Sequence, residues 1–234
     1  MSELEHQIAG NVARIREQIA SAAARSGRDA QCVRLVAVTK YVGPDEVLAL
    51  LNAGCCELGE SRPQELWKKV SALSNTAVHW HMIGHLQRNK VRRTLPAVEL
   101  VHSCDSLRLL QTINSEAGRD GSASHVLLEV NVAGDVDKHG FLPDEIAPLL
   151  PVIAGLSHVK VHGLMGMAAR GTDCVTARQY FVRLRELRDR LDALDVPGIS
   201  LKELSMGMSG DFETAIEEGA TIVRVGKSLF AGVP

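Results

Sequence analysis

The chain has 234 residues, of which 45% are hydrophobic and 23% charged, enough for one large domain with a substantial core. A net charge of −2 without a long basic run argues against nucleic acid as the main partner, and no apolar stretch is long enough to span a membrane. The five cysteines form no CxxC pair, which is typical of a reducing cytoplasm rather than of a disulfide framework.

Apolar runs of strand length alternate with amphipathic segments along the whole sequence. Apolar residues at helical spacing predict a first helix over residues 3–25. The predicted strands that follow cover residues 33–40, 56–60, 78–84, 98–105, 125–133, 159–167, 200–206 and 221–225. The predicted helices between them cover residues 44–52, 62–73, 88–95, 106–118, 143–154, 173–194 and 211–218.

This alternation indicates the fold class. Buried apolar strands separated by amphipathic helices are typical of a parallel sheet with crossover helices. Eight such units favour an α/β fold with a single closed (β/α)₈ TIM-type barrel and one extra N-terminal helix. A doubly wound open sheet is the alternative. The sequence contains no linker or internal repeat, so we expect residues 1–234 to form a single domain.

Several residues at the predicted carboxyl ends of the strands suggest chemistry, because functional groups of a barrel gather there. Lys40 follows the first strand and is a candidate nucleophile toward an aldehyde, the alternative being an ordinary solvated lysine. Two small-residue turns, at 207–210 and 226–228, suggest a phosphate cradle. Arg224 lies in the strand between these turns, where an ion pair at the barrel rim is its alternative role.

A lysine that forms a Schiff base and a phosphate site at one barrel mouth are the groups that bind pyridoxal 5′-phosphate. If Arg224 faces the pyridine nitrogen of this cofactor, its guanidinium can only donate a hydrogen bond and keeps that nitrogen unprotonated. This disfavours transamination but leaves racemisation and simple binding open. An unrelated phosphate-sugar barrel enzyme is a further alternative, in which Lys40 meets no aldehyde.

Histidines in and after the third predicted strand resemble a metal cluster at first sight. His79, His81 and His85 have no carboxylate or cysteine at a suitable nearby spacing, so we expect no metal site. Residues 137–139 lie in a glycine-rich loop after the fifth strand. The sequence leaves open whether this loop is a lid or an ordinary turn.

The sequence resembles the family of pyridoxal phosphate homeostasis proteins over nearly its whole length. The motifs that carry this resemblance are VAVTK at 36–40, HMIGHLQRNK at 81–90, EVNVAGDVDKHG at 129–140, HGLMGM at 162–167, LSMGMSGD at 204–211 and VRVGKSLF at 223–230. Each motif alone is weak, but together they are highly specific. The resemblance implies a single (β/α)₈ barrel like the N-terminal domain of alanine racemase.

The resemblance also implies a set of cofactor-binding residues, in which Lys40 is the Schiff-base lysine and Arg224 faces the pyridine nitrogen. The full set is Lys40, Ser61, Met206, Ser209, Arg224, Gly226 and Lys227. Within it, the residues at 209, 226 and 227 would hold the phosphate. Two positions depart from the family pattern, since Ser61 stands where an asparagine is usual and Lys227 where a threonine is usual.

The function implied by the resemblance is pyridoxal phosphate binding for vitamin B6 homeostasis, without established catalysis. We expect a cytoplasmic monomer, with pyridoxal-phosphate-dependent apoenzymes as candidate acceptors of the cofactor. The alternative is a pyridoxal-phosphate-dependent amino-acid racemase, which in related folds uses a tyrosine from a second β domain as its second base. The sequence has no segment for that domain after the eighth strand and contains only Tyr41 and Tyr180, so we expect a carrier.

Overall fold

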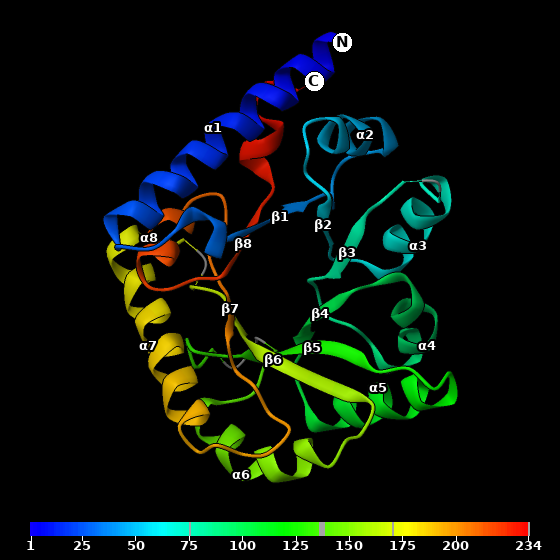
Figure 1. Cartoon of the computed structure of the whole chain (residues 1–234), viewed down its shortest axis with the longest axis vertical. Coiled ribbons are helices and arrows are strands. Elements are labelled where there is room, and N and C mark those ends of the chain that lie inside the picture. Colours follow the sequence, from blue (N-terminus) through cyan, green and yellow to red (C-terminus); the bar gives the residue numbers. More distant parts are fainter. Residues whose placement is uncertain (75, 136–138, 170, 234) are drawn as a thin grey trace.

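The computed structural model describes residues 1–74, 76–135, 139–169 and 171–233, and its eight parallel strands close into a barrel (Figure 1). Each strand pairs with the next one in the chain, and β8 pairs with β1. The strands are β1 (Arg34–Val38), β2 (Glu57–Glu60), β3 (His79–Met82), β4 (Leu100–Cys104), β5 (Ser124–Val130), β6 (Val159–Gly166), β7 (Glu203–Ser205) and β8 (Ile222–Val225). The predicted barrel is confirmed, and the open sheet is wrong.

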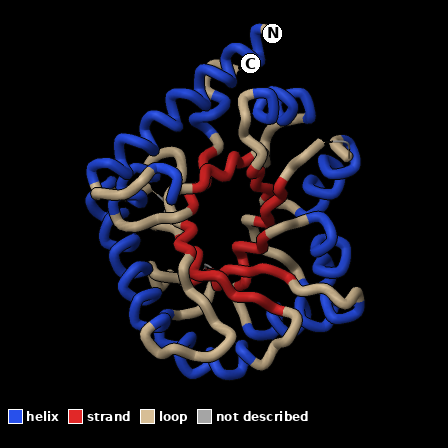
Figure 2. The backbone as a smooth tube through the Cα atoms, viewed as in Figure 1, coloured by secondary structure: helices blue, strands red, loops and turns tan. Residues whose placement is uncertain are grey.

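Helices surround the ring of strands on the outside (Figure 2). The α-helices are α1 (Glu3–Arg25), α2 (Pro44–Asn52), α3 (Pro63–Ala72), α4 (Val91–Thr94), α5 (Leu107–Arg119), α6 (Pro143–Ala154), α7 (Cys174–Asp192) and α8 (Phe212–Glu217). The short 3₁₀ helices are η1 (Ala30–Cys32), η2 (Arg88–Lys90), η3 (Leu95–Ala97) and η4 (Lys227–Phe230). Within the described part of the chain, no helix has the length and apolar character needed to cross a membrane.

One predicted helix differs in the structure. Residues 88–95 were expected to form one helix, but η2, α4 and η3 follow each other there as three short pieces. Pro96 lies inside η3, where its ring and its missing N–H oppose a longer α-helix.

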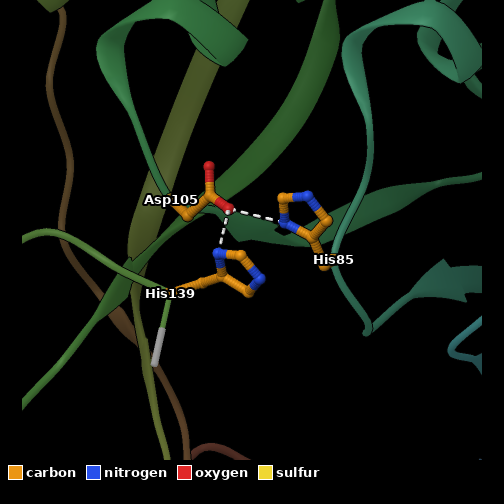
Figure 3. Close-up of side chains that lie close together, drawn as sticks. All are labelled: His85, Asp105 and His139. Atoms are coloured by element: carbon orange, nitrogen blue, oxygen red, sulfur yellow. Dashed lines mark hydrogen bonds and ion pairs between the residues drawn. The ribbon is translucent and has the colours of Figure 1, made fainter. Parts of the chain in front are cut away.

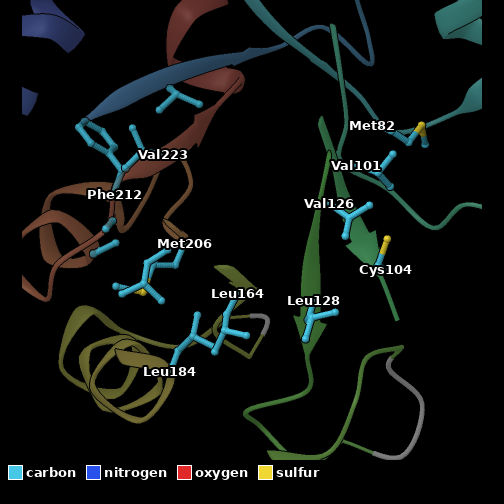
Figure 4. Packing of buried hydrophobic residues seen from close by; sticks show 14 of the residues in the cluster. Met82, Val101, Cys104, Val126, Leu128, Leu164, Leu184, Met206, Phe212 and Val223 are labelled. Atoms are coloured by element: carbon cyan, nitrogen blue, oxygen red, sulfur yellow. The ribbon is translucent and has the colours of Figure 1, made fainter. Parts of the chain in front are cut away.

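Apolar side chains fill two separate regions. The larger cluster lies between the strands and the helices; Figure 4 shows Leu164 of β6, Leu184 of α7 and Met206 together within it. A small cluster lies inside the barrel and consists of Val36, Leu100, Leu127, Met165 and Ile222. Because successive side chains of a strand point to opposite faces, the inward Ile222 predicts that Arg224 also points inward.

The extra helix α1 packs outside the barrel against α2, α8 and η4 (Figure 1). Ser2 begins this helix with a capping box: its hydroxyl accepts from the backbone N–H of Glu5, whose carboxylate accepts from the N–H of Ser2. Further along, the buried amide of Asn11 donates to the carbonyl oxygens of Leu229 (3.1 Å) and Ala231 (2.9 Å). Helix α1 therefore holds the segment that follows β8.

We predict that Asn11→Ala lowers the free energy of unfolding by about 1–3 kcal/mol, because it leaves two carbonyl groups without their donor. Glu17→Ala, at an exposed position of the same helix, is the matched control and is expected to change it by less than about 0.5 kcal/mol. Urea denaturation of the three proteins measures the difference. Equal stability of the two variants would contradict the role of Asn11.

Candidate functional site

A cavity of about 940 Å³ lies at the carboxyl end of the barrel. Six of the predicted site residues line it: Lys40, Ser61, Ser209, Arg224, Gly226 and Lys227. Met206 is the exception, since its side chain is fully buried in the outer apolar cluster and does not line the cavity. The structure therefore brings together residues from the first, second, seventh and eighth strands, as their places at the strand ends predicted.

Lys40 stands at the mouth of the cavity, two residues after β1 ends at Val38. Its side chain is exposed, and its Nζ lies 4.9 Å from the centre of the Tyr41 ring. Tyr41 itself is 84% exposed. The amine of Lys40 is thus accessible to a molecule that enters from solvent, and a cation–π contact with Tyr41 orients it.

A buried ion pair beneath Lys40 joins the ends of β1 and β2. The Nζ of Lys69 donates to Oε2 of Glu60 (2.6 Å) and to the carbonyl oxygen of Thr39 (2.5 Å). The other carboxylate oxygen of Glu60 accepts from the backbone N–H of Ser61 at 2.8 Å. Because Glu60 is fully buried and Lys69 nearly so, these contacts fix the backbone on both sides of the cavity entrance.

Backbone N–H groups converge at the edge of the cavity that follows β8, the strand paired with β1. The hydroxyl oxygen of Ser209 accepts from the N–H of Gly226 (3.2 Å) and of Ser228 (3.4 Å). A Cβ atom at Gly226 would come within 3.2 Å of the Cβ of Val38, so glycine permits this close approach of β8 to β1. Two N–H donors beside a hydroxyl group form a site that suits an anion. The exposed Lys227 adds a positive charge at this edge.

Arg224 lies on the floor of the cavity and is 4% exposed. Its guanidinium donates to Oγ of Ser205 (2.6 Å) and to the carbonyl oxygen of Gly166 (3.1 Å). Burial lowers its pKa to about 10, while the carboxyl groups of Glu129 and Asp211 act in the opposite direction. The alternative of an ion pair at the barrel rim is wrong, because Arg224 is a buried cation held by two neutral acceptors.

A chain of hydrogen bonds continues from Arg224 through the barrel interior. Ser205 Oγ lies 2.8 Å from Nδ1 of His102, and Nε2 of His102 lies 2.9 Å from Nδ1 of His81. The Nε2 of His81 in turn contacts the carboxylate of Glu57 at the start of β2. Burial, followed by the neighbouring positive charges, holds the pKa of His102 well below its usual value, so His102 is neutral.

One assignment of the protons satisfies every contact of this chain. Ser205 accepts from Arg224, and its own hydroxyl proton is directed at Nδ1 of the neutral His102. His102 then donates from Nε2 to His81, which donates from its own Nε2 to Glu57. Every member has a partner, and the hydrogen bond from His81 lowers the pKa of Glu57.

Glu129 is a site residue that sequence reasoning missed. It lies near the end of β5, lines the cavity and is 7% exposed. Burial and, to a lesser extent, the negative charge of Asp105 together raise its pKa from 4.5 to about 7. A carboxyl group that titrates near neutrality can accept or donate a proton. The predicted strand extends to residue 133, whereas β5 ends at Val130, and this earlier end places Glu129 at the mouth of the barrel.

The three histidines that resembled a metal cluster point to separate partners. His79 pairs with Glu99, His81 with His102 and Glu57, and His85 with Asp105. The ring of His85 also stacks on the ring of His139, which lies in the loop after β5 that the sequence interprets as a lid or an ordinary turn. Residues 137 and 138 of that loop lie outside the described residues.

Comparison with known proteins yields matches over almost the whole chain. The family model described as "Alanine racemase, N-terminal domain" matches residues 10–234. A pyridoxal phosphate homeostasis protein of Aquifex aeolicus is 42% identical over 219 residues, which cover 94% of this chain and 95% of the relative. The protein of the same name from Deinococcus radiodurans is 42% identical over 214 residues, covering 91% and 96%.

A solved structure agrees with these sequence matches. PipY of Synechococcus elongatus, with pyridoxal phosphate bound, is similar to this chain with a TM-score of 0.85 and 31% sequence identity. The match covers 95% of this chain and 99% of PipY. The similarity therefore includes the whole barrel and the strand ends that form the cavity.

The raised pKa of Glu129 predicts a pH dependence of stability. A carboxyl group whose folded pKa is above its unfolded value adds stability below the unfolded pKa, and this contribution is lost as the pH rises through about 7. Relative to Glu129→Gln, which stays neutral, the wild type should lose about 3 kcal/mol of unfolding free energy between about pH 4.5 and pH 8. Denaturant titrations across this range measure it; parallel curves for the two proteins would refute the shift.

Proposed function

Because the chain belongs to the family of pyridoxal phosphate homeostasis proteins, we propose that it binds pyridoxal 5′-phosphate in the cavity at the carboxyl end of the barrel. Residues 1–234 would act as one cofactor-binding domain in pyridoxal phosphate and vitamin B6 homeostasis. The observation that carries this proposal is the presence of Lys40, Arg224 and the Ser209–Gly226 edge in one cavity. An amine, a fixed cation and an anion-binding edge match the aldehyde, the ring and the phosphate of the cofactor.

In this proposal, Lys40 carries the cofactor covalently through its aldehyde, as a Schiff base. Its exposed amine supports this role, since an incoming aldehyde would reach it without a movement of the protein. The ion pair of Glu60 with Lys69 supports it indirectly, because the carbonyl oxygen of Thr39 is held directly before Lys40. Ser61 would contact the ring from the neighbouring strand end, since it lines the same cavity.

The phosphate would bind at Ser209, at the N–H groups of Gly226 and Ser228, and near Lys227. The convergence of these N–H groups on the Ser209 hydroxyl supports this assignment. At position 227 the backbone and the ammonium group replace the hydroxyl of the usual threonine. Such an edge binds a dianion through both hydrogen bonds and charge.

Arg224 would face the pyridine nitrogen and limit the chemistry. When bound, pyridoxal phosphate supplies an aldehyde for amines and a ring that accepts electrons. Arg224 stays protonated near neutral pH, because its pKa of about 10 is well above that range. A guanidinium only donates, so it would keep the ring nitrogen unprotonated and weaken electron withdrawal. This property favours storage and delivery of the cofactor over transamination.

The carrier would act as a monomer in the cytoplasm and deliver pyridoxal phosphate to apoenzymes that depend on it. The five cysteines are all free thiols, which supports a reducing compartment. The exposed Lys40 and Lys227 at the cavity support release of the cofactor without a large rearrangement.

A second candidate is a pyridoxal-phosphate-dependent amino-acid racemase. One observation favours it: Glu129, with a pKa of about 7, lines the same cavity as Lys40. Racemisation needs two groups that exchange a proton on opposite faces of the substrate, and a carboxyl group that titrates near neutrality suits one of them.

We predict that Lys40→Ala abolishes covalent attachment of pyridoxal phosphate. The proteins are incubated with the cofactor, reduced with borohydride and digested, and mass spectrometry locates the modified peptide. Lys202→Ala, at an exposed position outside the cavity, is the matched control and should keep full modification at residue 40. Equal labelling of Lys40→Ala and wild type would refute the role of Lys40, and a wild type that binds no cofactor would refute the proposed function.

The carrier and the racemase differ in hydrogen exchange at the substrate α-carbon. The cofactor-loaded protein is incubated with L-alanine in D₂O, and α-deuterated D-alanine is measured against a solution of free pyridoxal phosphate. We expect no increase over that control, because the relatives that match this chain over most of its length are named homeostasis proteins rather than racemases. Exchange that falls about 100-fold in Glu129→Gln would instead establish the racemase and its second base.

A further inference from the structure

Two histidines and one aspartate converge beside the cavity from three separate segments of the chain (Figure 3). His85 follows β3, Asp105 follows β4, and His139 lies between β5 and α6. Nδ1 of His85 lies 2.8 Å from Oδ2 of Asp105, and Nδ1 of His139 lies 3.8 Å from the same oxygen. The three atoms all lie within 4.8 Å of one another, so three possible ligands surround one point.

The two imidazole rings lie close together beside Asp105 and turn the same ring nitrogen toward it. The imidazole rings of His85 and His139 are stacked, with centroids 4.0 Å apart and an interplanar angle of 11°. Both rings direct Nδ1 toward Asp105 (Figure 3). The other oxygen of Asp105 accepts from the Ser106 hydroxyl at 3.0 Å. Ser106 therefore anchors the carboxylate and leaves Oδ2 directed at the two histidines.

An ordinary ion pair accounts for only part of this arrangement. The 2.8 Å contact of His85 with Asp105 is a hydrogen bond, but the 3.8 Å separation from His139 is too long for one. If both stacked rings were protonated, their like charges would repel each other at 4.0 Å. A divalent cation between the three atoms would instead use both nitrogen lone pairs and the carboxylate charge.

The distances are compatible with such an ion. Two ligand atoms that each lie about 2.1 Å from one zinc ion can be at most about 4.2 Å apart. Both separations from Oδ2 of Asp105, 2.8 Å and 3.8 Å, are within this limit. The ligand atoms of the two histidines lie within 4.8 Å of each other, so binding of one ion can require a small movement of one ring. The side chain of His139 is 61% exposed, so a small adjustment there meets little resistance from packing.

We propose that His85, Asp105 and His139 bind a divalent transition-metal ion, with zinc as the best match to two imidazoles and one carboxylate. Three protein ligands leave a coordination position open, as in zinc sites that bind a further molecule. Because His85 and His139 also line the cavity that contains Lys40, this position adjoins the space for a ligand. The ion would take an anionic oxygen ligand there, such as a carboxylate. Pyridoxal phosphate binding is not a premise of this inference.

The test measures zinc binding by the full-length protein after treatment with a chelator. Each protein is equilibrated with Zn²⁺ by dialysis, and bound zinc is counted by mass spectrometry. We expect one zinc ion per chain in the wild type, and an affinity lower by about 10-fold or more in Asp105→Asn and in His139→Ala. Thermal unfolding without metal shows that each variant is folded, and Zn²⁺ should raise the melting temperature of the wild type but not of His139→Ala.

His125→Ala is the matched control. His125 and His162 form another stacked, hydrogen-bonded histidine pair, with centroids 4.8 Å apart, and they contact each other rather than a shared carboxylate. This variant should bind zinc like the wild type. Equal binding by wild type, Asp105→Asn and His139→Ala would overturn the proposal, since zinc would then be held elsewhere, for example by exposed thiols. A wild type that binds no zinc would overturn it as well.

Discussion

The burial of Arg224 inside the barrel is the constraint on which the rest of the site depends. A guanidinium that is 4% exposed requires acceptors, and two of its donors are satisfied by the neutral oxygens of Ser205 and Gly166. Its positive charge therefore persists at the cavity floor, balanced at longer range by Glu129 and Asp211. The same requirement makes Ser205 an acceptor and links Arg224 to the hydrogen-bonded residues His102, His81 and Glu57 across the barrel. One buried cation thus places a positive charge at the cavity floor and is the first donor of the hydrogen-bond chain inside the barrel.

Buried charges are satisfied in one way between the strands and helix α3, and in another way in the cavity. Between β1, β2 and α3, Glu60 and Lys69 neutralise each other, and their remaining contacts hold the backbone next to Lys40. In the cavity, Arg224 and Glu129 are buried charged residues that line the wall, and each shifts the pKa of the other. Ionisable groups with shifted pKa values that line a cavity are more typical of ligand binding than of stability.

The sequence predicted the barrel because each strand and helix carries its own periodic signal. It predicted that Lys40 and Arg224 lie at one site because the carboxyl ends of the strands meet at one mouth of the barrel. The error at Met206 has a simple cause. Ser205 points into the barrel, so the next side chain points outward into the helix-facing core. Glu129 and the contact of His81 with His102 were missed because they depend on which inward side chains meet across the barrel. No local pattern contains that information.

The proposed role of Arg224 bears on the choice between carrier and enzyme together with the number of available bases. In the sequence, the scarcity of tyrosines argues against racemisation. The structure weakens that argument, because Glu129 lines the cavity and its pKa of about 7 suits a second base. A second base accelerates proton transfer only if the ring can accept the electrons that the substrate α-carbon releases. If Arg224 faces the ring nitrogen as proposed, it can only donate, so it weakens this acceptance whichever base is present. The group that fixes the cavity electrostatics is then also the group that limits the chemistry.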